Sequence, residues 1–110
     1  LSLEEMFRLA LTCTPGSEAY NKIFMTAVQL FPDNPVANLN AACIALMQRD
    51  VQSATHYLEK APEVPETALA KGVLHLLQEN YEEAETLFKQ AKAAGLSQAD
   101  NNLKQILELK

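Results

Sequence analysis

The sequence predicts an all-α fold, an α-α superhelix of three antiparallel helix pairs with a capping helix at the C-terminal end. Three observations support this prediction. The strong helix formers Ala, Leu, Glu, Gln and Lys dominate a chain of 110 residues, which has only three Gly and no Trp. Apolar residues recur at helical spacing, and the same spacing returns along the chain. The length suits one domain.

The repeat is clearest between Asn80 and Ala91. Its apolar positions share one helical face: Tyr81, Ala84, Leu87, Phe88 and Ala91. The same frame occurs about thirty residues earlier in Val51, Ala54, Tyr57, Leu58 and Ala61, and earlier again in Tyr20, Ile23, Phe24 and Ala27. These three segments are therefore expected to be equivalent helices.

Each of these segments follows another amphipathic one, over 3–12, 35–48 and 67–79. Connections of one to five residues make consecutive helices antiparallel neighbours. Small residues such as Ala42 and Gly72 allow close approach, and large ones such as Leu58 and Phe88 fill the space between pairs. The pairs are expected over 1–31, 34–61 and 66–94.

Helix ends carry local signals. N-cap arrangements mark three starts: Ser2 with Glu5, Asn80 with Glu83, and Ser17. Pro35 and Pro65 suit first-turn positions, and Gly95 suits the left-handed residue that closes a helix. The last helix, over 97–110, has one apolar stripe (Leu103, Ile106, Leu107) and is expected to cap the array.

The segments 38–61 and 68–91 resemble tetratricopeptide repeat (TPR) motifs. The residues that match the pattern are Ala42, Asp50, Ala54, Leu58, Ala61, Gly72, Tyr81, Ala84, Phe88 and Ala91. The first pair departs from it, with Arg8 and Tyr20 in place of small residues and Ser17 in place of an aromatic one. The resemblance implies a right-handed stack that binds other proteins, and says little about which.

A fainter similarity is to TPR-like C-terminal regions of uncharacterised cell-envelope proteins of gut Gram-negative bacteria. It is carried by Pro32-Asp33 and the run 37–42. It favours the cell envelope or periplasm and leaves the cytoplasm open. Because the chain opens at Leu1 without an initiator Met, we expect a segment of a longer bacterial protein.

Several classes of chemistry lack support in the sequence. The net charge is −5 and no basic stripe is visible, which argues against nucleic acid as a partner. No apolar run reaches the ~18 residues of a membrane span. His56, which is expected at the surface, and His75, which can face a neighbouring repeat, lack metal-ligand spacing. We expect no metal, no cofactor and no small-molecule substrate.

The remaining reactive residues also have simpler explanations. Cys13 and Cys43 have no CxxC spacing, and whether they pair is left open. The carboxylate pairs 4–5 and 82–83 fall in first helical turns, where the helix dipole favours negative charge. No nucleophile or phosphate-loop motif is present. The chain is therefore expected not to be an enzyme.

The resemblance places a binding surface on the concave face, which the first helix of each pair lines. One version of that face grips a C-terminal carboxylate through Lys, Arg and Asn. In this chain the positions that correspond to those Lys, Arg and Asn residues are Glu5, Leu9, Asn40, Glu66 and Ala70. Only Asn40 agrees, and the acidic residues repel a carboxylate, so this activity is rejected.

The predicted groove is instead mostly apolar. It consists of Glu5, Leu9, Leu39, Asn40, Cys43, Leu69, Val73 and Leu76. Part of this set is expected to be core, because the sequence does not fix the rotation of each helix. The sequence therefore predicts a protein-interaction module that receives an apolar or amphipathic segment from a partner or from its parent chain. The alternative is a structural spacer or self-assembly domain, which packs on its own N-terminal domain or on another copy.

Overall fold

The computed structural model describes residues 2–109, and within this range the chain forms seven α-helices and no strand, which confirms the all-α prediction. Residue 110 of the predicted capping helix lies outside the described range. The helices are α1 (Leu3–Ala10), α2 (Glu18–Leu30), α3 (Pro35–Met47), α4 (Val51–Glu59), α5 (Pro65–Leu77), α6 (Tyr81–Ala93) and α7 (Gln98–Leu109).

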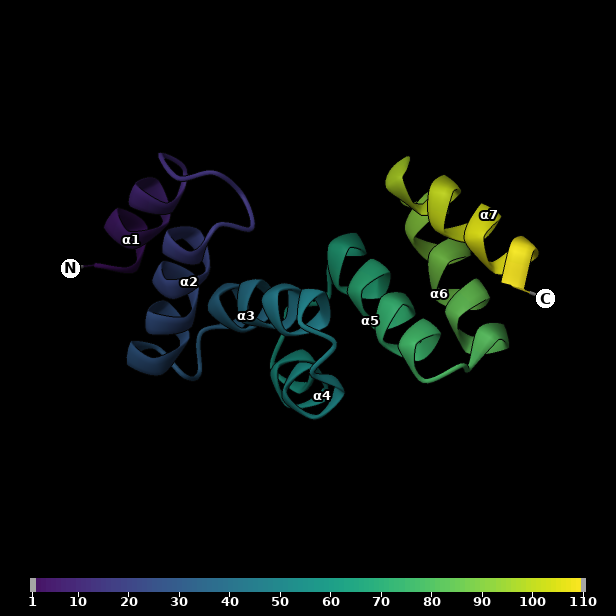
Figure 1. Ribbon diagram of the computed structural model, residues 1–110, viewed down its shortest axis with the longest axis horizontal. Helices are drawn as coiled ribbons and strands as arrows, with labels where there is room; N and C mark the ends of the chain where they lie inside the picture. The colour runs from purple at the N-terminus through teal and green to yellow at the C-terminus, as the bar shows by residue number, and fades with distance from the viewer. Residues whose placement is uncertain (1, 110) are drawn as a thin grey trace.

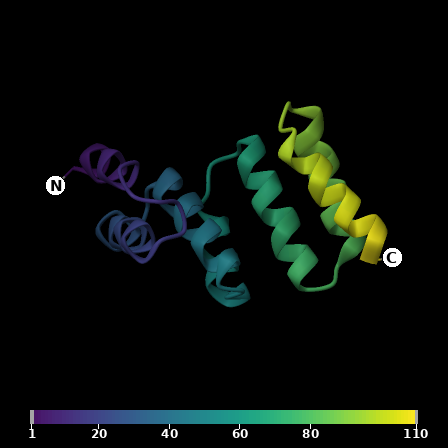
Figure 2. The same ribbon diagram turned by 45° about the horizontal axis from the view of Figure 1, so that its top comes forward.

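The helices follow one another along an elongated molecule. Its extents are 45 × 25 × 25 Å, and the two chain ends lie at opposite ends of the long axis (Figure 1). The last three helices, α5, α6 and α7, run side by side in both views (Figures 1 and 2). The superhelical twist of the whole array stays a prediction.

The core is divided among neighbouring helices, and each even-numbered helix packs between the two that flank it in sequence. Phe24 and Val28 of α2 pack with α1 and α3, and Leu58 of α4 packs with α3 and α5. Phe88 of α6, which is fully buried, packs with α5 and α7. The three matching segments are thus helices that bury their shared apolar faces, as the sequence predicts.

Three turns between helices have the same geometry. Arg49 (φ 59°), Glu79 (φ 63°) and Gly95 (φ 104°) take left-handed conformations after α3, α5 and α6. In each turn the next amide donates back to a carbonyl in the last turn of the helix, at 2.8 to 3.0 Å: Asp50 to Ala45, Asn80 to His75, and Leu96 to Ala91. Arg49 and Glu79 have the same place in the two best repeats, so the backbone repeats as well as the sequence.

Most of the predicted helix ends are confirmed. Ser2 and Glu5 form a reciprocal capping box, Ser17 accepts a hydrogen bond from the Tyr20 amide, and Gly95 is left-handed. The prediction for Asn80 is wrong, because its side chain makes no capping hydrogen bond; its Nδ2 lies 3.4 Å from Nδ1 of His75 instead. The turn that brings the Asn80 amide onto the His75 carbonyl also brings these side chains together.

Two predicted boundaries are also corrected. Helix α1 ends at Ala10 rather than Thr12, and the Thr12 hydroxyl donates to the Leu9 carbonyl at 2.6 Å. The α1–α2 connection therefore runs over 11–17, longer than the expected one to five residues. Helix α5 begins at Pro65 and ends at Leu77, so it is shifted by two residues from the predicted range 67–79. Pro65 does occupy the first-turn position predicted for it, where the helix needs no backbone amide donor.

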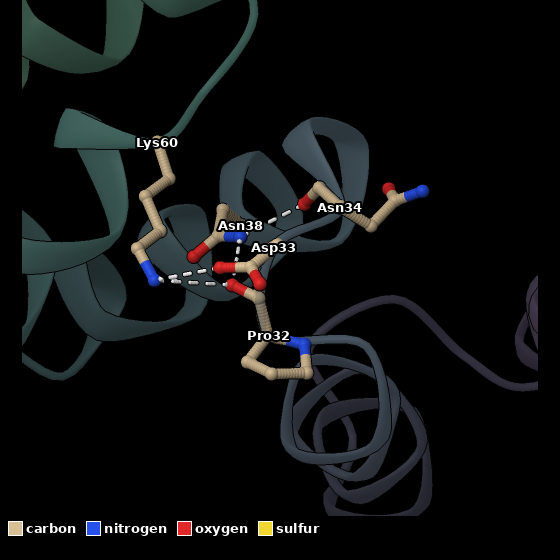
Figure 3. Close-up of polar contacts among 5 residues, drawn as sticks. All are labelled: Pro32, Asp33, Asn34, Asn38 and Lys60. Atoms are coloured by element: carbon tan, nitrogen blue, oxygen red, sulfur yellow. Dashed lines mark hydrogen bonds and ion pairs between the residues drawn. The ribbon is translucent and has the colours of Figure 1, made fainter.

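The α2–α3 junction is tied to the end of α4. The buried Asn38 amide donates to the carbonyls of Pro32 (3.0 Å) and Asn34 (2.8 Å) (Figure 3). The Lys60 ammonium reaches the same junction from α4, at 3.1 Å from the Asp33 carboxylate and 3.5 Å from the Pro32 carbonyl. The Asn38 side chain thus gives the Pro32 carbonyl a hydrogen-bond partner, while the Asn34 carbonyl also accepts from the Asn38 backbone amide. The Lys60 contacts link the end of α4 to this junction.

Candidate functional site

Helix α3 presents an exposed stripe made of Val36, Asn40, Cys43 and Met47. The spacing i, i+4, i+7, i+11 places these side chains along one side of the helix. Val36 is 47% and Met47 is 60% exposed, Cys43 is exposed and Asn40 is half-buried. The other faces of α3 are used in packing, with Ile44 toward α2 and Leu46 toward α4 and α5. This stripe is the side of α3 that neighbouring helices leave open.

A cavity of about 270 Å³ lies beside the stripe. It is lined by Pro15, Gly16, Tyr20, Phe24, Asn40, Cys43, Ile44 and Met47. The lining comes from the α1–α2 connection, α2 and α3, and most of its members are apolar. The connection closes one side, because Gly16 (φ 82°) comes close to the Met47 methyl group; a Cβ at Gly16 would lie 3.8 Å from it. The sequence predicts that α2 and α3 are neighbours, but it does not predict which side chains of the two helices and of the 11–17 connection surround a cavity.

Asn40 and Cys43 of the lining differ in their chemistry. The Asn40 side chain makes no hydrogen bond within the part of the chain that the structure describes, so its amide has a free donor and acceptor. Desolvation by surrounding groups raises the pKa of the Cys43 thiol, although part of this side chain reaches solvent. Cys43 therefore stays a neutral thiol at neutral pH and acts here as a small apolar group.

The rest of the predicted groove is distributed differently. Leu39 packs against the cluster that joins α3, α4 and α5, while Leu69 and Leu76 pack against the one that joins α5, α6 and α7. Val73 contacts both clusters. All four are half-buried, so the structure assigns them mainly to packing. They were predicted as groove residues because they lie on the first helix of a pair, and part of the predicted set was expected to be core.

Two predicted groove residues lie on α1. Leu9 is 49% exposed, and Glu5 is exposed at the helix start. Glu5 already accepts the Ser2 amide at 3.2 Å, and hydrogen bonding by the Ser2 side chain and amide lowers the pKa of its carboxyl. Glu5 therefore has a local role in holding the helix end. Among the predicted residues, the structure brings Asn40 and Cys43 into one cavity.

The sequence analysis missed most of the cavity. Met47 and Val36 continue the spacing of Asn40 and Cys43, and this four-residue stripe was a signal that could have identified both. Tyr20 and Phe24 were assigned to the core of the repeat. They do pack there, with ring centroids 4.7 Å apart, and they also form one wall of the cavity. No signal in the sequence marks the Pro15-Gly16 wall.

The other residues considered for chemistry do not form a second site with this cavity. His56 is exposed, as predicted, and lies next to the Tyr57 ring, with centroids 5.8 Å apart. Cys13 and Cys43 are both free thiols. Across residues 2–109, no three His, Cys, Asp or Glu side chains gather as a metal site would require, and no helix has the length and apolarity to cross a bilayer.

No family model matches the chain, and no curated protein matches it.

Proposed function

We propose that this chain is a TPR-like, non-enzymatic protein-interaction module that binds an apolar or amphipathic polypeptide segment along α3. The observation that carries the proposal is the exposed stripe Val36, Asn40, Cys43 and Met47 with the cavity beside it. An exposed apolar strip next to a preformed hollow is the arrangement that groove-binding domains use for peptide side chains.

The size and polarity of the cavity suit a single side chain with its backbone. At about 270 Å³ it lies just below the ~300–1,000 Å³ of small-molecule pockets. Phe24, Ile44 and Met47 offer an apolar lining for one aliphatic or aromatic side chain. The Asn40 amide has a donor and an acceptor, which a peptide group can satisfy together.

Charge limits which peptide segments this site can bind. No Lys or Arg lines the cavity. The whole chain has a charge of −5. An acidic segment would be repelled, so the segment is neutral or basic and contributes at least one large apolar residue.

Selection from a random dodecapeptide display library tests the proposal. We expect selected peptides to contain a large apolar residue, and to bind Met47→Glu at least tenfold more weakly than the unsubstituted chain. Asn40→Ala is expected to weaken binding less, because it removes one hydrogen-bonding side chain. Leu107→Glu is the matched control, since Leu107 is 71% exposed on α7, far along the array.

Because the substituted side chains at Met47 and Leu107 are exposed, circular dichroism is expected to show the same helicity in both variants. Charges at Leu39 or Val73 are a poorer test, because both residues pack in core clusters. Equal peptide binding by Met47→Glu and the unsubstituted chain would contradict the proposal.

Self-assembly is the second candidate, and it has its own observation. Leu11 (82%), Leu30 (60%) and Leu107 (71%) are large apolar residues left open at several places on the array. Sedimentation across concentration separates the two candidates. A monomer at all concentrations that binds selected peptides supports the interaction module, and concentration-dependent dimers that Leu107→Glu disrupts support self-assembly.

A further inference from the structure

A larger cleft, of about 670 Å³, lies between α4, α5 and α6. Its lining comes from the C-terminal half of α4, the 60–64 connection, one side of α5 from Pro65 to His75 and the second half of α6. It is open to solvent and does not include any residue of the α3 stripe. The cleft is therefore a feature separate from the proposed peptide site.

The cleft exists because α4 is short. Helix α4 has 9 residues, whereas α2 and α6, which hold the same place in their pairs, have 13. Four residues are about one turn, or ~6 Å of helix. The chain instead crosses from Glu59 to Pro65 in an irregular connection that contains Pro62 and Val64. The missing turn leaves the first half of α5 uncovered on that side.

This cleft and the predicted groove use opposite sides of α5. Lys71 lines the cleft, whereas Val73 belongs to the predicted groove. Two residues of helix turn the side-chain direction by ~200°. A ligand in the cleft therefore leaves the first-helix face free, and the two surfaces can be tested independently.

The cleft combines an apolar lining with acidic residues. Val64, which is 37% exposed, contributes apolar surface together with the half-buried Pro62 and Leu87. Glu59 and Glu63 are exposed and form no ion pair with any residue that the structure describes. Lys71 is the one Lys or Arg among the lining residues. Two unpaired carboxylates against one ammonium make the side-chain charge of the cleft negative.

The helix ends at the cleft also make its electrostatic potential more negative. Helix α4 ends at Glu59 and α6 ends at Ala93, and residues near both ends line the cleft. The carboxyl end of a helix has a partial negative charge, and the amino end a partial positive one. Only α5 begins here, so two negative helix ends face one positive end. The field in the cleft favours a cation.

An unsatisfied buried hydroxyl lies in the same lining. Thr67 is 4% exposed, and its Oγ1 has no hydrogen-bond partner among the described residues. Buried hydroxyls are nearly always satisfied in folded proteins, by the protein or by a bound group. A ligand group or an ordered water bound in the open cleft can therefore supply the hydrogen bond that this hydroxyl lacks.

We infer that this cleft is a second binding site, for an arginine- or lysine-bearing peptide segment of a partner protein. The aliphatic stem of the basic side chain packs on Pro62, Val64 and Leu87, as long cationic side chains do on apolar surfaces. Its charged head pairs with Glu59 and Glu63. Arginine is favoured over lysine, because its planar group can bond two acceptors together.

The display selection described above tests this inference in a second arm. The chain with Met47→Glu, which removes the α3 site, is offered the random dodecapeptide library. We expect enriched peptides to contain Arg or Lys beside an apolar residue. Each enriched peptide is then synthesised and titrated against Glu59→Gln/Glu63→Gln, and the expected loss of affinity is at least tenfold.

Three matched measurements decide the outcome. Replacing the basic residue of the peptide by citrulline or norleucine is expected to weaken binding to the parent chain and to leave binding to Glu59→Gln/Glu63→Gln nearly unchanged. Binding is expected to weaken with added salt. Glu82→Gln/Glu83→Gln, on exposed residues of α6 outside the cleft, is expected to bind as the parent does.

Enrichment of acidic or uncharged peptides, or equal affinity for the parent and Glu59→Gln/Glu63→Gln, would overturn the inference. Because Glu59 and Glu63 are exposed, the double variant is expected to keep its helicity and thermal midpoint, so that a lost affinity reports the cleft itself. Failure in this arm leaves the Met47→Glu result untouched, since the two arms use different residues.

Discussion

At the scale of single residues, the contact between Gly72 and Phe88 shows how closely two helices approach. A Cβ placed on Gly72 would lie 2.5 Å from Cε1 and 2.7 Å from Cδ1 of Phe88. The Phe88 ring is fully buried among α5, α6 and α7, so it has no solvent into which to move. Gly72 is therefore required by packing, not by its backbone angles.

This contact makes Gly72→Ala destabilising. Helix propensity alone favours Ala over Gly by ~1 kcal/mol. Overpacking of a filled core costs about 1–3 kcal/mol, and here the ring has no free side. We expect a lower free energy of unfolding in urea denaturation. In a Phe88→Leu background the same substitution is expected to cost less, because the ring that it meets is gone. A more stable Gly72→Ala protein would show that the ring has room to shift.

At the scale of elements, helix caps set where each helix begins, and α4 is the clearest case. Asp50 accepts the Ser53 amide at 3.1 Å, and hydrogen bonding by the Ser53 side chain and amide lowers the pKa of its carboxyl. The turn before it uses Arg49 in a left-handed conformation. The start of α4 is thus fixed locally, while Lys60 at its end pairs with Asp33 of the α2–α3 junction.

The Asp50 cap predicts a pH dependence. A carboxyl whose pKa is lower in the folded state stabilises the fold above its unfolded pKa of ~3.9. That contribution is lost as the pH falls through the lower, folded value. Asp50→Asn keeps a capping side chain without the titration. We expect the thermal midpoint of the unsubstituted chain to fall more than that of Asp50→Asn as the pH is lowered from about 5 toward 3, as followed by circular dichroism. Parallel curves would contradict this.

At the scale of the whole molecule, each helix is stabilised mainly by packing against its neighbouring helices. The core consists of clusters that join α1 with α2 and α3, α3 with α4 and α5, and α5 with α6 and α7. Helix α7 closes the last cluster with Ala99 and Ile106, which are 0% and 1% exposed. In arrays of this kind the stability of each unit depends chiefly on its neighbours. A destabilising substitution at one end is therefore expected to increase local unfolding at that end only.

Ile106→Ala tests this view of the array. Removing a fully buried aliphatic side chain typically costs about 2–5 kcal/mol. Leu107→Ala is the adjacent control, and because Leu107 is 71% exposed we expect a change within about 0.5 kcal/mol. Hydrogen exchange in Ile106→Ala is expected to accelerate mainly in α5, α6 and α7. Equal acceleration in α1 and α2 would show that the molecule unfolds as one cooperative unit instead.

The sequence by itself determined the seven helices, their order and the buried faces of α2, α4 and α6, because helical periodicity, caps and breakers are local and repeat along the chain. It did not determine the rotation of α3, where Leu39 packs inward and Met47 lies outside. Nor did it determine the cleft under the shortened α4. Both depend on which helices pack against each side of a given helix, and these helices come into contact only when the chain folds.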